Sequence, residues 1–260
     1  MNLFDIGVNL THKSFQKDRQ EVINRAVEAG VDKIVLTGTS LRGSQEALKL
    51  AKESKCLYST AGVHPHDAKT FTSKTISELR KLLKDDCCIS VGECGLDFNR
   101  NFSPQDKQIE CFTEHIHLAN ELKLPMFLHE RDAFEDFYKI LTATKNKEIK
   151  AVVHCFTGKK EHMQAYLDIG CYIGITGWIC DERRGIELKN MLKDIPADRL
   201  MLETDAPFLT PRDMRPKPAK GRNEPAFLKH ITIVAAAAIG KSPEQLAEET
   251  YQNSKSFYNL

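Results

Sequence analysis

The sequence predicts an α/β fold of the (β/α)8-barrel type, on three observations. Short apolar runs alternate eight times with longer segments of helical period, which is typical of strand–helix repeats. The runs are continuous and rich in Val and Ile, as expected of parallel strands that are buried on both faces. The chain has 260 residues, close to the roughly 250 of a typical barrel of this kind. We therefore expect one barrel domain over residues 1–260.

The expected elements follow one another along the chain in strict alternation. The strands are expected at Leu3–Val8, Lys33–Gly38, Leu57–Val63, Cys88–Gly92, Met126–His129, Val152–Phe156, Tyr172–Thr176 and Leu200–Thr204. The helices between them are expected at Glu21–Ala29, Ser44–Ser54, Ile76–Lys84, Pro104–Leu122, Phe134–Thr144, Glu161–Ile169 and Ile186–Leu192. The tail from Glu224 to Leu260 is expected to form two closing helices that are split near Gly240.

A doubly wound open sheet is the alternative arrangement of alternating strands and helices. Such a sheet favours a glycine-rich GxGxxG loop after its first strand, whereas this chain has Gly7-Val8-Asn9-Leu10-Thr11 there. The closed barrel is therefore the preferred prediction.

Composition and charge narrow the class of protein. The chain has 41% hydrophobic and 28% charged residues, which excludes wholesale disorder. Its 37 basic and 36 acidic residues give a formal net charge of +1, which excludes a histone-like polycation but allows a local phosphate site.

The sequence has the features of a cytoplasmic protein. The start, Met1-Asn2-Leu3-Phe4-Asp5, places an acid where a secretory leader needs an apolar run, and no stretch approaches a membrane span. The eight cysteines form no CxxC pair, so we expect reduced thiols. We expect a monomer that does not associate with membranes.

Ionisable side chains gather at the ends of the expected strands. Glu93, His129, His154 and Asp205 follow or end four different strands, and His64 follows a fifth. Since the carboxyl ends of barrel strands face one mouth, we expect these side chains to converge there.

Imidazoles and carboxylates at one mouth favour a site for a divalent metal, Zn²⁺, Mn²⁺ or Mg²⁺. Such a metal lowers the pKa of bound water and generates a nucleophile at neutral pH. Taken singly, each residue also has a structural explanation: a packed histidine, an Asp205 that caps a turn, or a Glu93 in an ion pair. The joint pattern favours the metal, because burying four polar side chains at strand ends costs free energy unless they bind a common partner.

A basic segment follows the last expected strand. Residues 212–223 contain five basic side chains and one acid, and their prolines and glycine predict a loop. The segment is either a solvated surface loop or a rim that binds phosphate, and the neighbouring metal mouth favours the rim. We expect Arg131, Lys217 and Arg222 to bind substrate phosphate.

Seven ordered motifs resemble one known family. They are Asp5-Ile6-Gly7-Val8-Asn9-Leu10, Gly62-Val63-His64-Pro65-His66, Gly92-Glu93-Cys94-Gly95-Leu96-Asp97, His129-Glu130-Arg131-Asp132, His154-Cys155-Phe156-Thr157-Gly158, Glu203-Thr204-Asp205-Ala206-Pro207 and Gly221-Arg222-Asn223-Glu224-Pro225. Together they resemble the TatD family of metal-dependent deoxyribonucleases over essentially the whole chain.

The resemblance implies a barrel of the metallo-dependent hydrolase type and a 3′-to-5′ exonuclease that prefers single-stranded DNA. The sequence leaves open whether DNA or RNA is the preferred substrate, and we expect a role in DNA repair. The resemblance also implies Mg²⁺ as the metal that supports turnover. By motif match, Glu93, His129 and His154 are metal ligands, Asp205 is a ligand and general base, and His64 lies near metal or phosphate. We expect Glu93, Asp205 and His64 to be catalytic.

The chain departs from the family pattern after its first strand. Many relatives have His-x-His where this chain has Gly7 and Asn9. Gly7 offers no ligand atom, and Asn9 offers only a neutral carbonyl oxygen. The sequence therefore leaves open whether one or two metals bind.

Two other functions fit the same residues. One is a metal-dependent amidohydrolase, lactonase or esterase that acts on a small molecule, and the other is a non-catalytic, metal-stabilised scaffold. The basic segment favours a phosphate substrate over the first, and open coordination would favour catalysis over the second.

Overall fold

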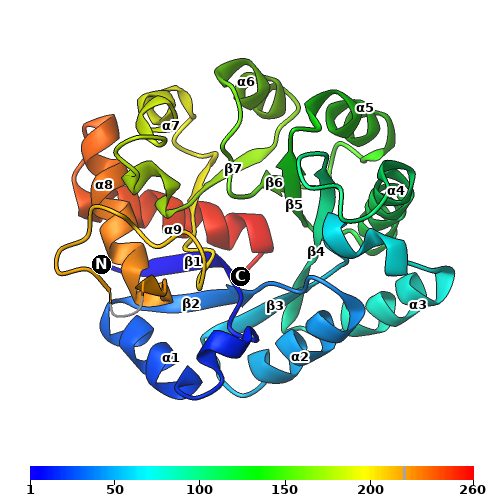
Figure 1. The fold of residues 1–260 in the computed structure, drawn as a ribbon, viewed down its shortest axis with the longest axis horizontal. Helices are drawn as coiled ribbons and strands as arrows, with labels where there is room; N and C mark the ends of the chain where they lie inside the picture. Colours follow the sequence, from blue (N-terminus) through cyan, green and yellow to red (C-terminus); the bar gives the residue numbers. More distant parts are fainter. Residues whose placement is uncertain (219–220) are drawn as a thin grey trace. The chain divides into compact units, whose positions relative to one another are not determined.

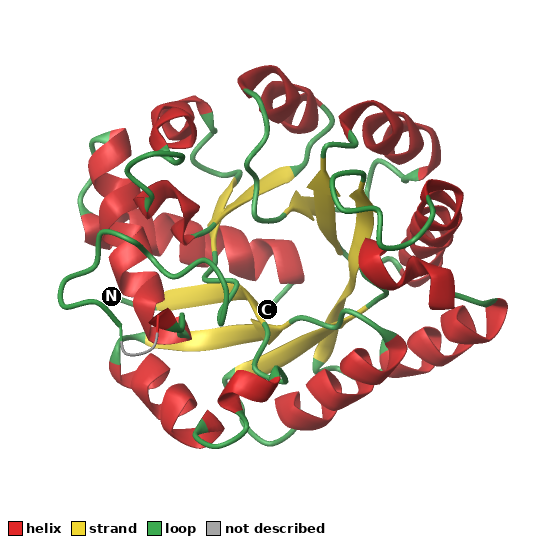
Figure 2. Ribbon diagram, in the orientation of Figure 1, coloured by secondary structure: helices red, strands yellow, loops and turns green. Residues whose placement is uncertain are grey.

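The fold is of the predicted α/β class, with eight parallel strands ordered β1 to β8 in one sheet and helices between them (Figures 1 and 2). A computed structural model describes residues 1–218 and 221–260. The order and alternation of the strands confirm the (β/α)8-barrel prediction. By its internal contacts the chain divides into two compact units, residues 1–35, 155–160 and 173–260, and residues 36–154 and 161–172.

The first unit holds both ends of the chain. Its strands are β1 (Leu3–Val8), nearly all of β2 (Val31–Leu36), most of β7 (Tyr172–Ile175) and β8 (Leu200–Leu202). Its helices are α1 (Arg19–Glu28), α7 (Ile186–Met191), α8 (Leu228–Ile239) and α9 (Pro243–Tyr258), with the short 3-10 helices η1 (Lys13–Phe15), η3 (Gly177–Cys180), η4 (Leu192–Asp194) and η6 (Pro225–Phe227). Helix α9 packs on β1, where Tyr258 stacks on Phe4 with ring centroids 5.7 Å apart.

The second unit holds four successive parallel strands. They are β3 (Leu57–Ala61), β4 (Cys88–Asp97), β5 (Met126–Arg131) and β6 (Ala151–Val153), each paired with the next. Its helices are α2 (Leu41–Ala51), η2 (Pro65–Thr70), α3 (Ser73–Leu82), α4 (Gln105–Leu122), α5 (Phe134–Thr144) and nearly all of α6 (Lys160–Asp168). Phe112 of α4 stacks on Phe137 of α5 with centroids 4.9 Å apart.

Strand β4 is longer than the sequence predicts, because it continues beyond Gly92 to Asp97. It shifts register between Gly92 and Cys94 and then pairs Gly95 with His129 of β5. Glu93 therefore lies within a buried strand, not after its end.

Three glycines permit the close approach of the strands around Glu93. A Cβ atom on Gly92 would collide with the Phe127 carbonyl oxygen, and one on Gly95 with the His129 carbonyl oxygen. A Cβ on Gly62, after β3, would lie 2.7 Å from the Gly92 Cα. Both Gly92 and Gly95 also have positive φ angles, which side chains disfavour.

Two helices begin about one turn earlier than the sequence predicts, because capping side chains extend them. The Ser40 hydroxyl accepts a hydrogen bond from the Gly43 N–H at the start of α2. Thr72 and Thr75 form a reciprocal capping box at the start of α3.

None of the helices in the described part of the chain is both long enough and apolar enough to cross a membrane. All eight cysteines are free thiols.

Candidate metal centre

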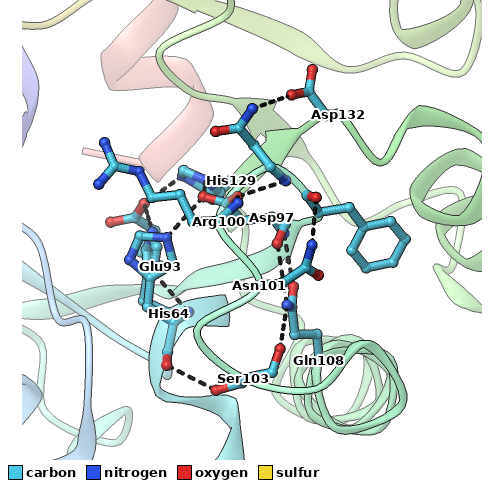
Figure 3. Close-up of polar contacts among 12 residues, drawn as sticks. His64, Glu93, Asp97, Arg100, Asn101, Ser103, Gln108, His129 and Asp132 are labelled. Atoms are coloured by element: carbon cyan, nitrogen blue, oxygen red, sulfur yellow. Dashed lines mark hydrogen bonds and ion pairs between the residues drawn. The ribbon is translucent and has the colours of Figure 1, made fainter.

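One oxygen of Glu93 lies at the centre of three imidazoles in the second unit. The Glu93 Oε1 atom lies 2.9 Å from His154 Nε2, 3.1 Å from His129 Nδ1 and 3.3 Å from His64 Nε2. Figure 3 shows His64 and His129 directed at this carboxylate. The structure thus brings together four of the residues that the sequence predicts for the site.

Successive strands hold these four residues. The Glu93 N–H donates to the Gly38 carbonyl oxygen at 2.8 Å, which fixes β4 at this point. His129 lies within β5, and the His154 N–H donates to the Leu128 oxygen just after β6. His64 follows β3, and its N–H donates to the Thr39 oxygen. Backbone hydrogen bonds thus set the positions of the four side chains.

The imidazoles keep the Glu93 carboxyl ionised. Glu93 and His154 are both 5% exposed. Burial raises the pKa of Glu93, but the facing rings of His154, His64 and His129 outweigh burial and hold that pKa well below its usual range. Burial lowers the pKa of His64. Burial also opposes the charge on His129, but Asp97 and Glu93 outweigh burial and raise the pKa of that ring. At neutral pH the centre therefore offers an ionised carboxylate, the form that binds a cation.

Asp97 supports the imidazoles from the end of β4. Its carboxylate lies 2.8 Å from His66 Nε2 and 3.4 Å from His129 Nε2. It also accepts the N–H groups of Asn99 and Arg100 at 3.1 and 2.9 Å. Although Asp97 is 1% exposed, these donors outweigh burial and lower its pKa.

Sequence reasoning assigned no role to Asp97 or His66. The available signal was their place in two of the quoted motifs, four residues after Glu93 and two after His64. The missing fact was that β4 continues to Asp97 and pairs it with Arg131 of β5, which places the carboxylate beside His129.

The residues of this centre fit a divalent metal. Ligand atoms of His64, Glu93 and His129 all lie within 4.8 Å of one another. The His129 ring turns its Nδ1 to Glu93 and its Nε2 to Asp97, so Nδ1 is the ring atom available to a metal at this centre. A carboxylate and imidazoles form a donor set that suits Mg²⁺, Mn²⁺ or Zn²⁺.

Asp205 belongs to the first unit, three residues after β8. Its N–H donates to the Gly7 carbonyl oxygen at 2.9 Å, and its Oδ1 accepts from the Asn9 side chain at 2.9 Å. Gly7 and Asn9 are the positions where the family pattern has histidines, and here they hold Asp205. Its role as a ligand and base stays a prediction.

Arg222 lies in a cluster of ion pairs in the first unit. Its guanidinium donates to both carboxylate oxygens of Asp18, at 2.8 and 2.6 Å, and to Glu224 at 2.7 Å. It also lies over the Phe15 ring, 4.8 Å from the centroid. A phosphate contact by Arg222 would compete with these carboxylates, and its predicted role is not tested by this geometry.

The other two predicted phosphate ligands are exposed. Arg131 is the last residue of β5, and Lys217 lies in the loop after β8. Ala219 and Lys220 of the predicted basic segment lie outside the described residues.

Comparison with known proteins gives one family. The family model of TatD-related DNases matches residues 4–259. The chain is 50% identical over 258 residues to a protein of Citrobacter koseri named 3′-5′ ssDNA/RNA exonuclease TatD, with 99% of each chain covered. A protein of the same name from Erwinia tasmaniensis is 51% identical over 259 residues, covering 99% of this chain and all of that protein.

Solved structures share the fold. A TatD homologue from Escherichia coli superimposes with a TM-score of 0.91 at 24% identity, over 99% of this chain and 98% of that one. A TatD-family hydrolase from Entamoeba histolytica has a TM-score of 0.88 at 28% identity, with the same coverage.

Proposed function

Because this chain belongs to the family of TatD-related DNases, we propose that it is a metal-dependent exonuclease that removes nucleotides from the 3′ end of single-stranded DNA or RNA. The observation that carries the proposal is the Glu93 carboxylate faced by three imidazoles in a chain about half identical to curated exonucleases. The chemistry is hydrolysis of a phosphodiester.

Glu93, His129, His154 and Asp205 would hold the divalent metal, Mg²⁺ in this proposal. When bound, the metal supplies a Lewis acid for the phosphate oxygen and an activated water. Asp97 orients the His129 ring, as an outer carboxylate does for a ligating histidine. His64, which lies beside Glu93, contacts the scissile phosphate.

Asp205 is the proposed general base. Its carboxylate takes the proton of the attacking water, while the Asn9 side chain fixes the carboxylate through Oδ1. Arg131, Lys217 and Arg222 offset charge on the phosphate, with Arg222 exchanging a carboxylate partner for a phosphate oxygen. In this arrangement the residues orient water and phosphorus before reaction, which contributes several kcal/mol to the lowered barrier.

A degradation assay with end-labelled single strands tests the proposal. The chelator-stripped protein should be inactive, and Mg²⁺ should restore activity. A 3′ label should be released at once as a mononucleotide, whereas a 5′ label should give a ladder of shortening products. DNA and RNA strands of one sequence give the preference between the two.

Glu93→Ala should reduce the rate by at least about 10³-fold, because the carboxylate that organises the centre is lost. Asp198→Asn, which alters an exposed ion pair with Arg199, is the control and should keep full activity. Nuclease activity that survives in Glu93→Ala, or release of the 5′ label first, contradicts the proposal.

The cytoplasm is the proposed compartment. The eight free cysteines support it, since reduced thiols are typical of a reducing environment. The role in DNA repair and the monomeric state stay predictions.

A further inference from the structure

Three side chains with metal-binding chemistry meet at a second place, within the first unit. Cys180 ends the 3-10 helix η3, Asp213 lies in the loop after β8, and His230 lies in the first turn of α8. Their ligand atoms all lie within 4.8 Å of one another. His230 Nε2 lies 2.7 Å from Asp213 Oδ1. This Cys180 cluster shares no residue with the Glu93 centre.

The Cys180 cluster is buried at its sulfur and accessible to solvent at its other two side chains. Cys180 is 1% exposed, so its sulfur lies at the bottom. The side chains of Asp213 and His230 are 27% and 28% exposed, so they form a rim that solvent reaches. An ion could therefore enter from solvent and find a sulfur, an oxygen and a nitrogen together.

The donor set selects the kind of ion. A thiolate, an imidazole and a carboxylate suit Zn²⁺, which binds Cys, His and Asp in tetrahedral geometry, whereas Mg²⁺ takes oxygen ligands. We propose that Cys180, Asp213 and His230 form a second metal site that binds Zn²⁺, with water as the fourth ligand.

The proton balance of binding is simple. Burial and the negative charge of Asp213 raise the pKa of the Cys180 thiol, so the thiol is a neutral S–H before an ion binds. Zn²⁺ takes the place of that proton, which passes to solvent, and a Zn–S bond forms without any change of oxidation state.

A metal bound at the Cys180 cluster would connect three segments of the chain, η3, the loop after β8 and α8. Asp213 belongs to the same loop as Arg212, Arg215 and Lys217. Binding would therefore fix this basic loop to η3 and α8. Arg212 also lies 3.6 Å from Asp181, the residue after Cys180, so the loop already has an ion pair beside the proposed site.

Cobalt substitution tests the site, because Co²⁺ reports a sulfur ligand by its thiolate-to-metal charge-transfer band in the near ultraviolet. The chelator-stripped full-length protein should gain this band on adding Co²⁺, and equimolar Zn²⁺ should abolish it. The Glu93 centre has no sulfur among its proposed ligands, so Glu93→Ala should keep the band. The result is thus independent of nuclease activity.

Two ligand variants and one matched control complete the experiment. Cys180→Ser should abolish the band, and His230→Gln should weaken Zn²⁺ binding by about tenfold or more. Cys87→Ser, at a half-buried thiol of the other unit, should keep both properties. Circular dichroism checks that each variant folds. If Cys180→Ser does not fold, the weaker Zn²⁺ binding of His230→Gln tests the site instead. A wild-type protein without the band, or a folded Cys180→Ser protein that keeps it, overturns the proposal.

Discussion

Glu93 organises the candidate centre through a single buried oxygen that faces His64, His129 and His154. The sequence could predict these four residues, because the carboxyl ends of successive parallel strands meet at one edge. It could not predict Asp97, since two glycines before it suggest a turn. Only the close approach of β4 to β5 shows that these glycines continue a strand.

Replacing Asp97 by Asn should weaken metal binding at the Glu93 centre. The amide keeps the shape of the carboxylate but loses the charge that faces His66 and His129. We expect about a 10–100-fold loss of metal affinity, the usual effect of losing an outer partner of a ligating histidine. The measurement is the Mg²⁺ concentration that gives half-maximal nuclease activity.

Asp85→Asn is the matched control for Asp97→Asn. Asp85 pairs with Lys52 on the surface of the same unit. The control should leave the metal requirement unchanged. An Asp97→Asn protein with the wild-type metal requirement would remove Asp97 from the support of the centre.

At the scale of elements, α4 fixes the chain just before His64. His115 of α4 is fully buried, and its Nε2 accepts the Val63 N–H at 3.1 Å. Its Nδ1 donates to the Cys111 carbonyl oxygen at 2.7 Å. The ring is thus held neutral between a helix and the end of a strand, a role that its sequence position in a helix did not reveal.

The buried His115 should make the stability of the protein fall in mild acid. Burial lowers its pKa from 6.5 to about 4, against the opposing hydrogen bond to Cys111. Between these values the unfolded chain binds the extra proton, so the free energy of unfolding falls as pH drops from 6.5 towards 4. From pH 7 to pH 5 we expect His115 to account for a loss of about 2 kcal/mol.

Urea unfolding at pH 7 and pH 5 measures this loss. His115→Gln retains a polar side chain but cannot titrate, so its loss of stability between the two pH values should be smaller than that of the wild type. Equal losses in the two proteins would show that His115 does not titrate as its burial requires.

At the scale of the whole molecule, the alternation of apolar runs and helical segments was enough to predict the fold class. Strand lengths were less predictable, since β6 and β8 end at Val153 and Leu202, before the polar residues that follow them. The Cys180 cluster could not be predicted, because its three residues meet only through the path of a loop. The assignment of residues 1–260 to one domain stays a prediction.

Metal binding to the folded state should raise the thermal stability of the whole chain. An ion that binds only the folded protein stabilises it by about 2.7 kcal/mol at 100 times its dissociation constant. Chelator-stripped protein should therefore melt several degrees higher when Mg²⁺ is added at saturation. Differential scanning calorimetry measures the shift.

Glu93→Ala should lose most of this Mg²⁺-dependent shift, because the centre loses its carboxylate. Asp198→Asn should keep it. If Mg²⁺ raises the melting temperature of Glu93→Ala as much as that of the wild type, the stabilising ion binds elsewhere.

The glycines around Glu93 have a consequence for how this chain tolerates mutation. Gly62, Gly92 and Gly95 carry no functional group, yet each leaves a space that the backbone or a neighbouring strand occupies. A saturation library selected for activity should be as intolerant at these three codons as at the histidine codons. Positions without a functional group would then be as constrained as the ligands, because neighbouring backbone atoms already occupy the space that a larger side chain would need.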